Sequence, residues 1–205
     1  MAQPPSWPPL VILPAPAADL CLDFANTRMW RGTESPQETL HGLDDVIDWC
    51  VGRGLLSPER RQRIALAGDA AAAAFAGILD LRETLYRLFS AVAAKAGAAP
   101  ADLRAFAEAL TAAPARSSIA AAPSGYGWSV PPAEPGAREL LTPVLWSAAD
   151  LLVGGRLTRV RQCANSQCLW LFLDDSKSGN RRWCSMSACG NRAKAHRHYL
   201  RHKAG

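Results

Sequence analysis

The sequence has no long hydrophobic run. None of its 205 residues belongs to a continuous apolar stretch of the about 18 residues that a membrane-spanning helix needs. The N-terminal apolar segment Leu10-Val11-Ile12-Leu13 is short, is bounded by Pro8, Pro9 and Pro14, and follows no basic residue. A secretory signal peptide has a longer apolar core behind a positively charged start. We therefore expect a cytoplasmic protein with no membrane partner.

The short motifs that mark common enzyme families are also missing. The chain contains no P-loop, no dinucleotide-binding glycine fingerprint, no H-E-x-x-H sequence and no nucleophile elbow. We therefore expect a protein that binds rather than an enzyme.

Acidic residues are scarce in the last fifty positions. Residues 156–205 contain eleven Lys and Arg side chains but only two acidic ones, Asp174 and Asp175, which gives a net charge of +9. Residues 1–155 contain twelve basic and sixteen acidic side chains, which gives −4. A basic tail on an acidic body is typical of a protein that contacts nucleic acid.

The six cysteines fall into two groups. Cys21 and Cys50 stand alone in apolar surroundings, as small buried hydrophobic residues do. The other four form two C-x4-C pairs separated by fifteen residues: Cys163, Cys168, Cys184 and Cys189. Four thiolates from two such pairs can surround one Zn²⁺ tetrahedrally, and a set without a free position predicts structural zinc. The alternatives are two disulfides, which a reducing cytoplasm disfavours, and four unconnected thiols, which would not be expected in two equal pairs inside a basic segment.

The segments around the cysteines predict a zinc-bound β-hairpin and a helix. The apolar run 169–173 predicts a strand that enters a polar turn, and Arg181-Arg182-Trp183 predicts the return strand. After Cys189, no proline interrupts residues 190–203, which favours a helix with one basic face. Three histidines follow the last cysteine and are expected on the surface of this helix: His196, His198 and His202.

The basic residues of the tail are the candidate nucleic-acid contacts. They are Lys177, Arg181, Arg182, Arg192, Lys194, Arg197 and Arg201. The alternative is a solvated basic tail without a partner. Arg192 lies close to the second cysteine pair, so it could instead clamp the start of the helix through backbone carbonyls.

Residues 163–201 resemble the CGNR-type zinc finger, which is named for the sequence that stands here as Cys189-Gly190-Asn191-Arg192. The preceding part is similar to the ABATE domain, which usually accompanies this finger, through the segment Leu20–Thr27 (LCLDFANT). The resemblance implies one structural zinc ion held by the four paired cysteines, DNA binding by the finger, and a role in stress-induced transcription regulation.

The expected domain organisation has three parts: a proline-rich arm over 1–18, a helical ABATE-like domain over 19–155, and the finger over 156–205. Gly154-Gly155 marks the boundary before the finger. The expected fold class is mainly α with minor β (α+β). It combines a helical N-terminal domain that contains a small β-hairpin with a zinc-bound β-hairpin and a C-terminal helix.

Several segments of the N-terminal domain predict helices. Ser35-Pro36-Gln37-Glu38 has the pattern of a capping box, and Ser57-Pro58-Glu59 resembles another helix start. Apolar stripes or alanine content predict helices near 43–52, 69–96, 100–113 and 137–153, and residues 117–130 read as a hairpin. In the helix over 100–113, Leu103, Phe106 and Leu110 are expected to face inward. Residues 20–26 could form either a strand or a helix.

Polar residues near the start of this domain are a possible ligand site: Asp23, Asn26 and Thr27, with Arg28 and Arg82 as ion partners. The alternative is that they cap a helix or a turn. Four tryptophans favour the core but could also line a small-molecule pocket: Trp30, Trp49, Trp128 and Trp146.

Together these features predict a bacterial-type, zinc-dependent DNA-binding transcription regulator. Its N-terminal domain would sense a small-molecule effector or form a homodimer. One alternative is an RNA-binding or ribosome-associated zinc protein, which would use the same charge and metal. Another is a ligand-binding protein or enzyme whose finger mediates assembly.

Overall fold

The computed structural model describes residues 11–13, 15–56, 61, 68–122, 125–130, 140–195 and 199. The predicted helix start at Ser57-Pro58-Glu59 lies outside these residues. Two candidate nucleic-acid contacts, Arg197 and Arg201, also lie outside them. So do the three histidines His196, His198 and His202.

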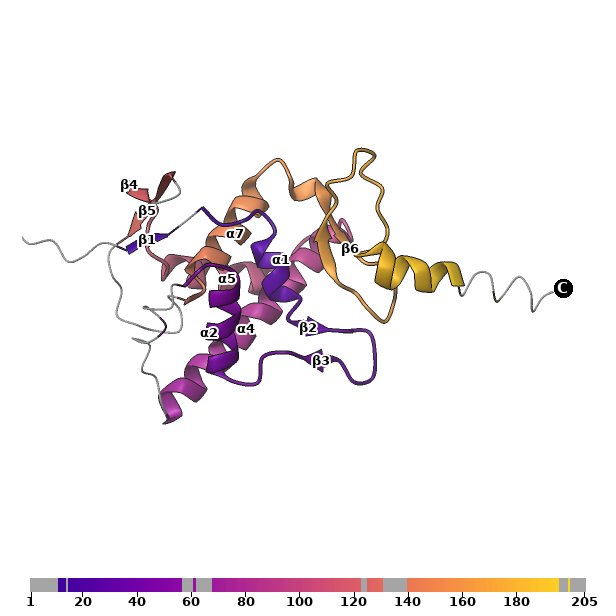
Figure 1. Cartoon of the computed structure of the whole chain (residues 1–205), viewed down its shortest axis with the longest axis horizontal. Coiled ribbons are helices and arrows are strands. Elements are labelled where there is room, and N and C mark those ends of the chain that lie inside the picture. The colour runs from indigo at the N-terminus through magenta and orange to yellow at the C-terminus, as the bar shows by residue number, and fades with distance from the viewer. Residues whose placement is uncertain are drawn as a thin grey trace, which may run out of the picture.

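Within the residues that the structure describes, five α-helices form the body of the molecule (Figure 1). They are α1 (Leu20–Ala25), α2 (Leu43–Gly52), α4 (Gly68–Ala93), α5 (Pro100–Thr111) and α7 (Thr142–Val153). Residues 20–26, which could have formed a strand or a helix, thus form a helix that ends at Ala25, and Asn26 and Thr27 of the LDFANT sequence lie in the turn after it. The other four helices follow the ranges predicted from apolar stripes or alanine content. No helix within the described ranges has the length and hydropathy needed to cross a membrane.

Helix α4 is the central element of the fold. Its alanine-rich start has high helix propensity, and its second half buries Leu85, Leu88 and Phe89 completely. It contacts α1, α2 and α5 in the N-terminal domain and also the two strands of the C-terminal segment. Helix α4 therefore packs against both the N-terminal domain and the C-terminal segment.

The described segments also form three small antiparallel sheets. The first has the order β1-β5-β4, with β1 at Val11–Leu13, β5 at Gly125–Val130 and β4 at Ser118–Ala122. The second pairs β2 (Arg28–Met29) with β3 (Gln37–Glu38), and the third pairs β6 (Val160–Gln162) with β7 (Leu171–Leu173). The hairpin predicted over 117–130 is confirmed as β4 and β5. Part of the predicted N-terminal arm pairs with it as β1, in the register Val11 to Val130.

Three local predictions are wrong. The capping-box pattern at residues 35–38 does not start a helix, because Gln37 and Glu38 form β3 and the next helix begins at Leu43. Leu103 was expected to face inward but is 44% exposed, whereas Phe106 on the same helix is buried. Residues 181–183 form no strand, and β7 pairs with the upstream strand β6 instead.

The strands of the C-terminal segment share the main hydrophobic core. Val160 on β6 and both Leu171 and Leu173 on β7 are buried in the same cluster as Phe24 of α1 and Leu88 of α4. The apolar side of this hairpin is therefore covered by the helical body. The cysteines at its far end lie in a second, smaller cluster with Phe172, Trp30, Trp170 and Trp183.

Candidate metal centre

The first cysteine pair is positioned by the turn that joins β6 to β7. The backbone N–H of Cys163 donates to the carbonyl of Trp170 at 2.8 Å, which extends the ladder by one bond beyond β6. The N–H of Cys168 donates to the carbonyl of Asn165 at 2.9 Å, and Leu169 adopts a left-handed conformation with φ of 55°. This tight turn brings the chain back on itself, so both sulfurs reach the same point.

The second pair is positioned by a short π-helix, η2 (Met186–Gly190). The hydroxyl of Ser185 accepts a hydrogen bond from the N–H of Ala188 at 3.2 Å and so caps the start of this turn. The guanidinium of Arg181 donates to the carbonyls of Trp183, at 2.8 Å, and Cys184. These bonds fix the backbone on which Cys184 and Cys189 stand.

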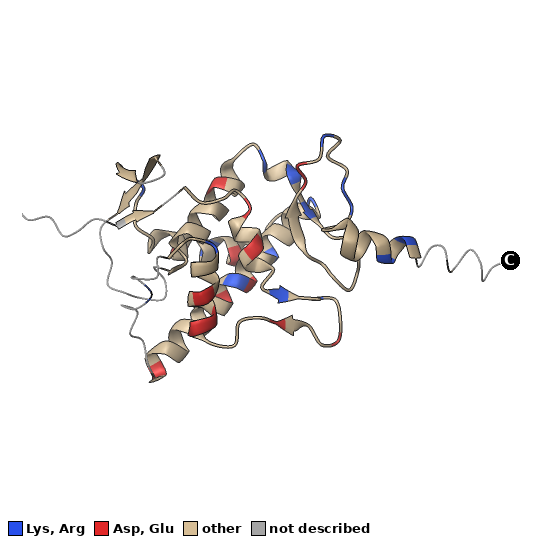
Figure 2. Cartoon of the chain, in the orientation of Figure 1, with Lys and Arg blue, Asp and Glu red and all other residues tan. Residues whose placement is uncertain are grey.

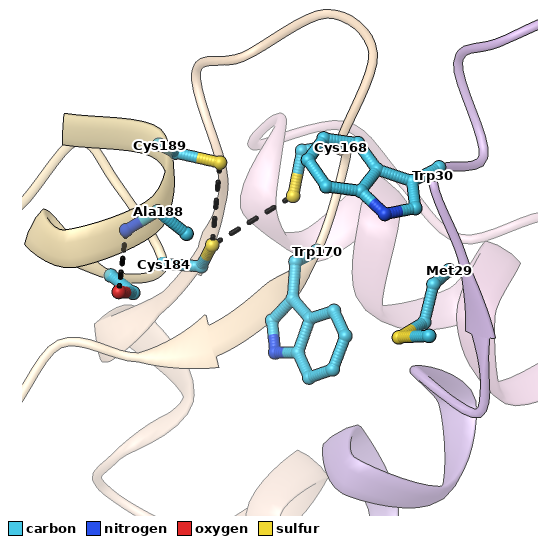
Figure 3. A pocket seen from close by; sticks show the side chains of 8 residues that line it. Met29, Trp30, Cys168, Trp170, Cys184, Ala188 and Cys189 are labelled. Atoms are coloured by element: carbon cyan, nitrogen blue, oxygen red, sulfur yellow. Dashed lines mark hydrogen bonds between the residues drawn. The ribbon is translucent and has the colours of Figure 1, made fainter. Parts of the chain in front are cut away.

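The four paired cysteines converge on one point, as Figure 3 shows for three of them. Their Sγ atoms all lie within 4.8 Å of one another. The sulfur of Cys184 lies 3.7 Å from that of Cys168 and 3.8 Å from that of Cys189. Zn–S bonds of about 2.3 Å in a tetrahedron place the sulfurs about 3.8 Å apart. The donor set therefore fits one zinc ion, and four sulfur ligands leave no position for a catalytic water.

The negative charge of the cysteine thiolates favours a bound cation at the centre of the cluster. Hydrogen bonds from neighbouring thiols, that of Cys184 first, lower the pKa of Cys168 to about 5. The resulting thiolate raises the pKa of Cys184, and burial raises the pKa of Cys189. Four thiolates cannot share this space without a positive charge between them. Bound zinc supplies that charge and cross-links the two turns.

Asn165 supports the cluster from outside the four ligands. Its side-chain Nδ2 donates to the sulfur of Cys189 at 3.5 Å, and its Oδ1 accepts from the N–H of Gln167 at 3.1 Å. Such contacts orient ligands and partly neutralise thiolate charge. The role of Asn165 was not expected from the sequence, where it stands as an ordinary polar residue between two cysteines.

The polar loop after β7 is fixed by a buried carboxylate. Asp174 is fully buried and accepts hydrogen bonds from the N–H and hydroxyl of Ser176 and from the N–H of Arg181 at 2.8 Å. These bonds, that of Ser176 first, lower the pKa of Asp174. Arg159 adds bonds to the carbonyls of residues 174 and 176. The loop that carries Lys177 is thus held in one conformation.

Figure 2 marks the candidate basic positions of the finger, which lie on the loop after β7 and on the helical segment that follows η2. Lys177, Arg182 and Lys194 are exposed, and Arg182 lies over the ring of Trp183 at 5.5 Å. Arg192 lies over the ring of Trp30 at 5.0 Å. The guanidinium of Arg181 is engaged with the backbone of the second cysteine turn and lies 4.5 Å from the ring of Phe172.

Several hydrogen bonds join the helical body to the first cysteine turn and to β7. The side-chain amide of Asn26 pairs with both backbone groups of Leu171. The hydroxyl of Tyr86 donates to the carbonyl of Leu169 at 3.0 Å. Gly32 donates its N–H to the carbonyl of Gln167 at 3.2 Å and packs directly against the carbonyl of Ser166.

The polar residues of the LDFANT segment make contacts within the protein. Asp23 pairs with Arg53, whereas Asn26 is 2% exposed and bonds to the finger. The hydroxyl of Thr27 donates to the carbonyl of Phe24 at 2.8 Å and lies 3.4 Å from Arg82. The structure therefore uses these residues to cap α1 and to join it to its neighbours.

The ion partners considered for this segment act in a different network. Arg82 is 2% exposed and binds Glu38 through both terminal nitrogens, at 2.6 and 2.7 Å. Arg28 lies 4.0 Å from Glu83, which also binds Arg31 at 2.6 Å. The network joins β2, β3, α4 and the β2–β3 loop, which contacts the finger through Gly32.

The remaining candidates are two cysteines and four tryptophans, which lie either in the core or beside a cavity. Cys21 and Cys50 are completely buried, and burial raises the pKa of each to about 12, so they remain thiols. Trp146 is 2% exposed and Trp49 packs against Phe24 at 5.4 Å, as core residues do. Trp128 packs beside Trp146. Trp30 instead lines a cavity beside the cysteines.

Two family models match the chain. The model for ABATE, described as "Putative stress-induced transcription regulator", matches residues 18–155, and the model for the CGNR zinc finger matches residues 159–202. A comparison with curated proteins finds no match. The first model covers more than half of the chain, and the second contains the four converging cysteines. The chain therefore belongs to the ABATE family and carries a CGNR zinc finger whose four cysteines hold one structural zinc ion.

Proposed function

We propose that this protein regulates transcription, in response to stress, by binding duplex DNA through its finger. Its proposed action is binding and not catalysis. The observation that carries the proposal is the charge of the finger: +9 over residues 156–205, against −4 over the rest of the chain. Lys and Arg side chains that contact DNA phosphates release counterions, which makes such a surface bind nucleic acid.

The proposed contacts are the exposed cations of the finger. Lys177, Arg182 and Lys194 are exposed, and within the described part of the chain they form no ion pair with a carboxylate. Arg192 adds a fourth charge beside Trp30. Arg197 and Arg201, which the structure does not describe, follow in the same basic segment. Arg181 acts indirectly, because its guanidinium holds the turn that carries Cys184.

The proposed role of the N-terminal domain is to sense an effector or to form a dimer. The contacts that support a sensing role run from α4 into the finger. Gln162 on β6 donates to Tyr86 at 3.1 Å and to Ser90 at 3.2 Å, and Tyr86 in turn bonds to Leu169. A displacement of α4 would therefore move the first cysteine turn.

The test is selection of bound sequences from random duplex DNA with the zinc-loaded full chain, followed by affinity measurements over a range of salt concentrations. The variant Arg182→Gln/Lys194→Gln removes two exposed charges of the finger. The matched control Lys95→Gln/Arg104→Gln removes one Arg and one Lys that are exposed on the helical body.

We expect the finger variant to reduce the slope of log K against log salt by about 2, with zinc content unchanged, and the control to leave the slope as it is. An equal slope for both variants contradicts the assignment of these contacts. Structured RNA is the competitor. If it displaces DNA at equal concentration, the protein is an RNA-binding protein instead.

A further inference from the structure

A cavity lies between the N-terminal domain and the outer side of the metal centre (Figure 3). Its volume is about 280 Å³. The N-terminal domain contributes Met29 and Trp30, from the end of β2. The finger contributes the other lining residues: Cys168, Trp170, Cys184, Ser185, Ala188 and Cys189.

This cavity extends beyond the position of the metal, which occupies only a part of it next to the cysteines. A zinc ion bound at about 2.3 Å from each sulfur occupies the centre of the four sulfurs and fills little of such a volume. Three of the four cysteines line the cavity, whereas Cys163 does not. The opposite side is formed by two indole rings and a thioether, which do not bind zinc. Most of the space therefore remains when the metal is bound.

The backbone at Trp30 is held in an unusual conformation. Trp30 has φ of 53°, in the left-handed region that bulky side chains rarely adopt. Its carbonyl accepts two hydrogen bonds from Thr33, one from the N–H at 3.0 Å and one from the hydroxyl at 2.8 Å. Strain of this kind concentrates at ligand-binding sites. Here it places the indole at the cavity, with the guanidinium of Arg192 5.0 Å from the ring.

We propose that this cavity binds a small, planar, apolar molecule of one or two aromatic rings. Offset or edge-to-face packing against Trp30 and Trp170 would hold such a ring, and the flexible thioether of Met29 would adapt to its edge. The volume lies just below the about 300–1,000 Å³ that accommodates drug-sized ligands, which limits the occupant to a small ring system.

A free molecule fits this lining better than a nucleobase does. Apart from the sulfurs, the polar side-chain groups of the lining are the indole N–H groups of Trp30 and Trp170 and the hydroxyl of Ser185, which is already bonded to the N–H of Ala188 and to the hydroxyl of Ser187. The N–H groups of a nucleobase would lose water without gaining a free side-chain oxygen acceptor in this lining. The proposal goes beyond the proposed function and does not depend on DNA binding.

Binding would also stabilise the junction between the two parts of the chain. The ligand would contact Met29 and Trp30 on one side and Trp170 on the other. A ligand that binds only the folded junction raises the melting temperature by mass action. Indole is a suitable probe, with cyclohexanol as the non-planar control.

The experiment is calorimetric titration of the zinc-loaded full chain with indole. We expect one saturable site per chain, with a Kd of roughly 0.1–1 mM, and weaker binding of cyclohexanol. Ala188→Phe places a ring in the cavity and should weaken indole binding at least tenfold. The matched control Ala195→Phe adds the same ring to an exposed position outside the lining and should bind indole as the parent chain does.

Zinc content is measured for each variant. Met29→Trp is a second filling variant, which places its ring on the side of the cavity that the N-terminal domain forms. It replaces Ala188→Phe in the titration if Ala188→Phe loses zinc. The proposal is overturned if indole shows no saturable binding, if cyclohexanol binds equally well, or if the filling variant that retains zinc binds indole normally. Competition by single-stranded DNA that is lost in the same filling variant would instead assign the cavity to a nucleobase.

Discussion

The side-chain amide of Asn26 pairs with the backbone of Leu171 as a neighbouring β-strand would. The N–H of Leu171 donates to Oδ1 at 3.0 Å, and Nδ2 donates to the carbonyl of Leu171 at 2.8 Å. Asn26 ends α1, and Leu171 begins the strand that follows the first cysteine turn. Both residues are buried, so one side chain satisfies both backbone groups of a finger residue that water cannot reach.

Asn26→Ala should therefore destabilise the protein by about 2–4 kcal/mol, because it leaves the buried N–H and carbonyl of Leu171 without partners. Chemical denaturation monitored by circular dichroism measures this loss. The control Asn180→Ala removes an exposed amide from the loop after β7 and should change the free energy of unfolding by less than about 0.5 kcal/mol. Equal stability of the two variants would show that the pairing contributes nothing.

Gly32→Ala should disrupt the contact between the N-terminal loop and the first cysteine turn. A Cβ at this position would lie 1.7 Å from the carbonyl oxygen of Ser166, which is backbone and cannot rotate away. We expect a loss of about 2–3 kcal/mol and faster zinc transfer to a chromogenic chelator. Gly42→Ala is the control, because Gly42 has extended backbone and open space around its Cβ position. An unchanged transfer rate in Gly32→Ala would contradict this role.

Glu38→Gln should weaken the network around Arg82 and alter the acid response. Burial alone would raise the pKa of Glu38, but hydrogen bonds from Arg82 and from the backbone outweigh it and lower that pKa from 4.5. The folded state thus binds protons more weakly than the unfolded state. The stability that results is present above about pH 4.5 and is lost as the pH falls through the lower, folded-state pKa.

At neutral pH we expect Glu38→Gln to cost about 2–3 kcal/mol, since the buried Arg82 keeps only Glu83 as a charged partner. Between pH 6 and pH 3 the melting temperature of the variant should fall less steeply than that of the parent chain. Glu34→Gln, on an exposed side chain of the same loop, should follow the parent curve. If the melting temperatures of Glu38→Gln and Glu34→Gln fall equally with pH, the acid response does not depend on Glu38.

The helices and the cysteine cluster could be predicted because their signals are local. The stripe of Leu43, Val46, Ile47 and Cys50 repeats with helical period, and all four are buried on α2. The cysteine cluster could be predicted from the equal spacing of the two cysteine pairs, because each pair lies on one tight, local turn. The difference in net charge between the finger and the rest of the chain could also be calculated from the sequence, because net charge does not depend on the fold.

The pairing of strands and the attachment of the finger could not be predicted, because they depend on distant residues. Glu38 sits in a capping-box pattern, but its carboxylate binds Arg82, 44 positions away, and the segment extends as β3. Leu171 pairs with Gln162 across the cysteine turn, whereas Arg181 and Arg182, in the segment predicted as the return strand, are exposed. Asn26 has the signature of a cap, and nothing in the sequence indicates Leu171 as its partner.

The finger cysteines and the core cysteines should respond differently to substitution. Cys184→Ser should abolish stoichiometric zinc, because a serine hydroxyl does not ionise to a ligand as a thiol does. Cys50→Ala should retain one zinc per chain and lose about 1–2 kcal/mol for the small cavity it leaves in the core. Metal analysis and thermal denaturation measure both effects.

The loss of zinc should also destabilise the helical body. Val160, Leu171 and Leu173 pack in the main core, so release of the hairpin uncovers part of α4 and lowers the melting temperature of the helices. The helical circular dichroism signal at 25 °C should largely remain, because α2, α5 and the rest of α4 keep their contacts with one another. A chelator should reproduce the effect of Cys184→Ser in the parent chain. If chelation leaves the melting temperature unchanged, the hairpin holds its place on α4 without the metal.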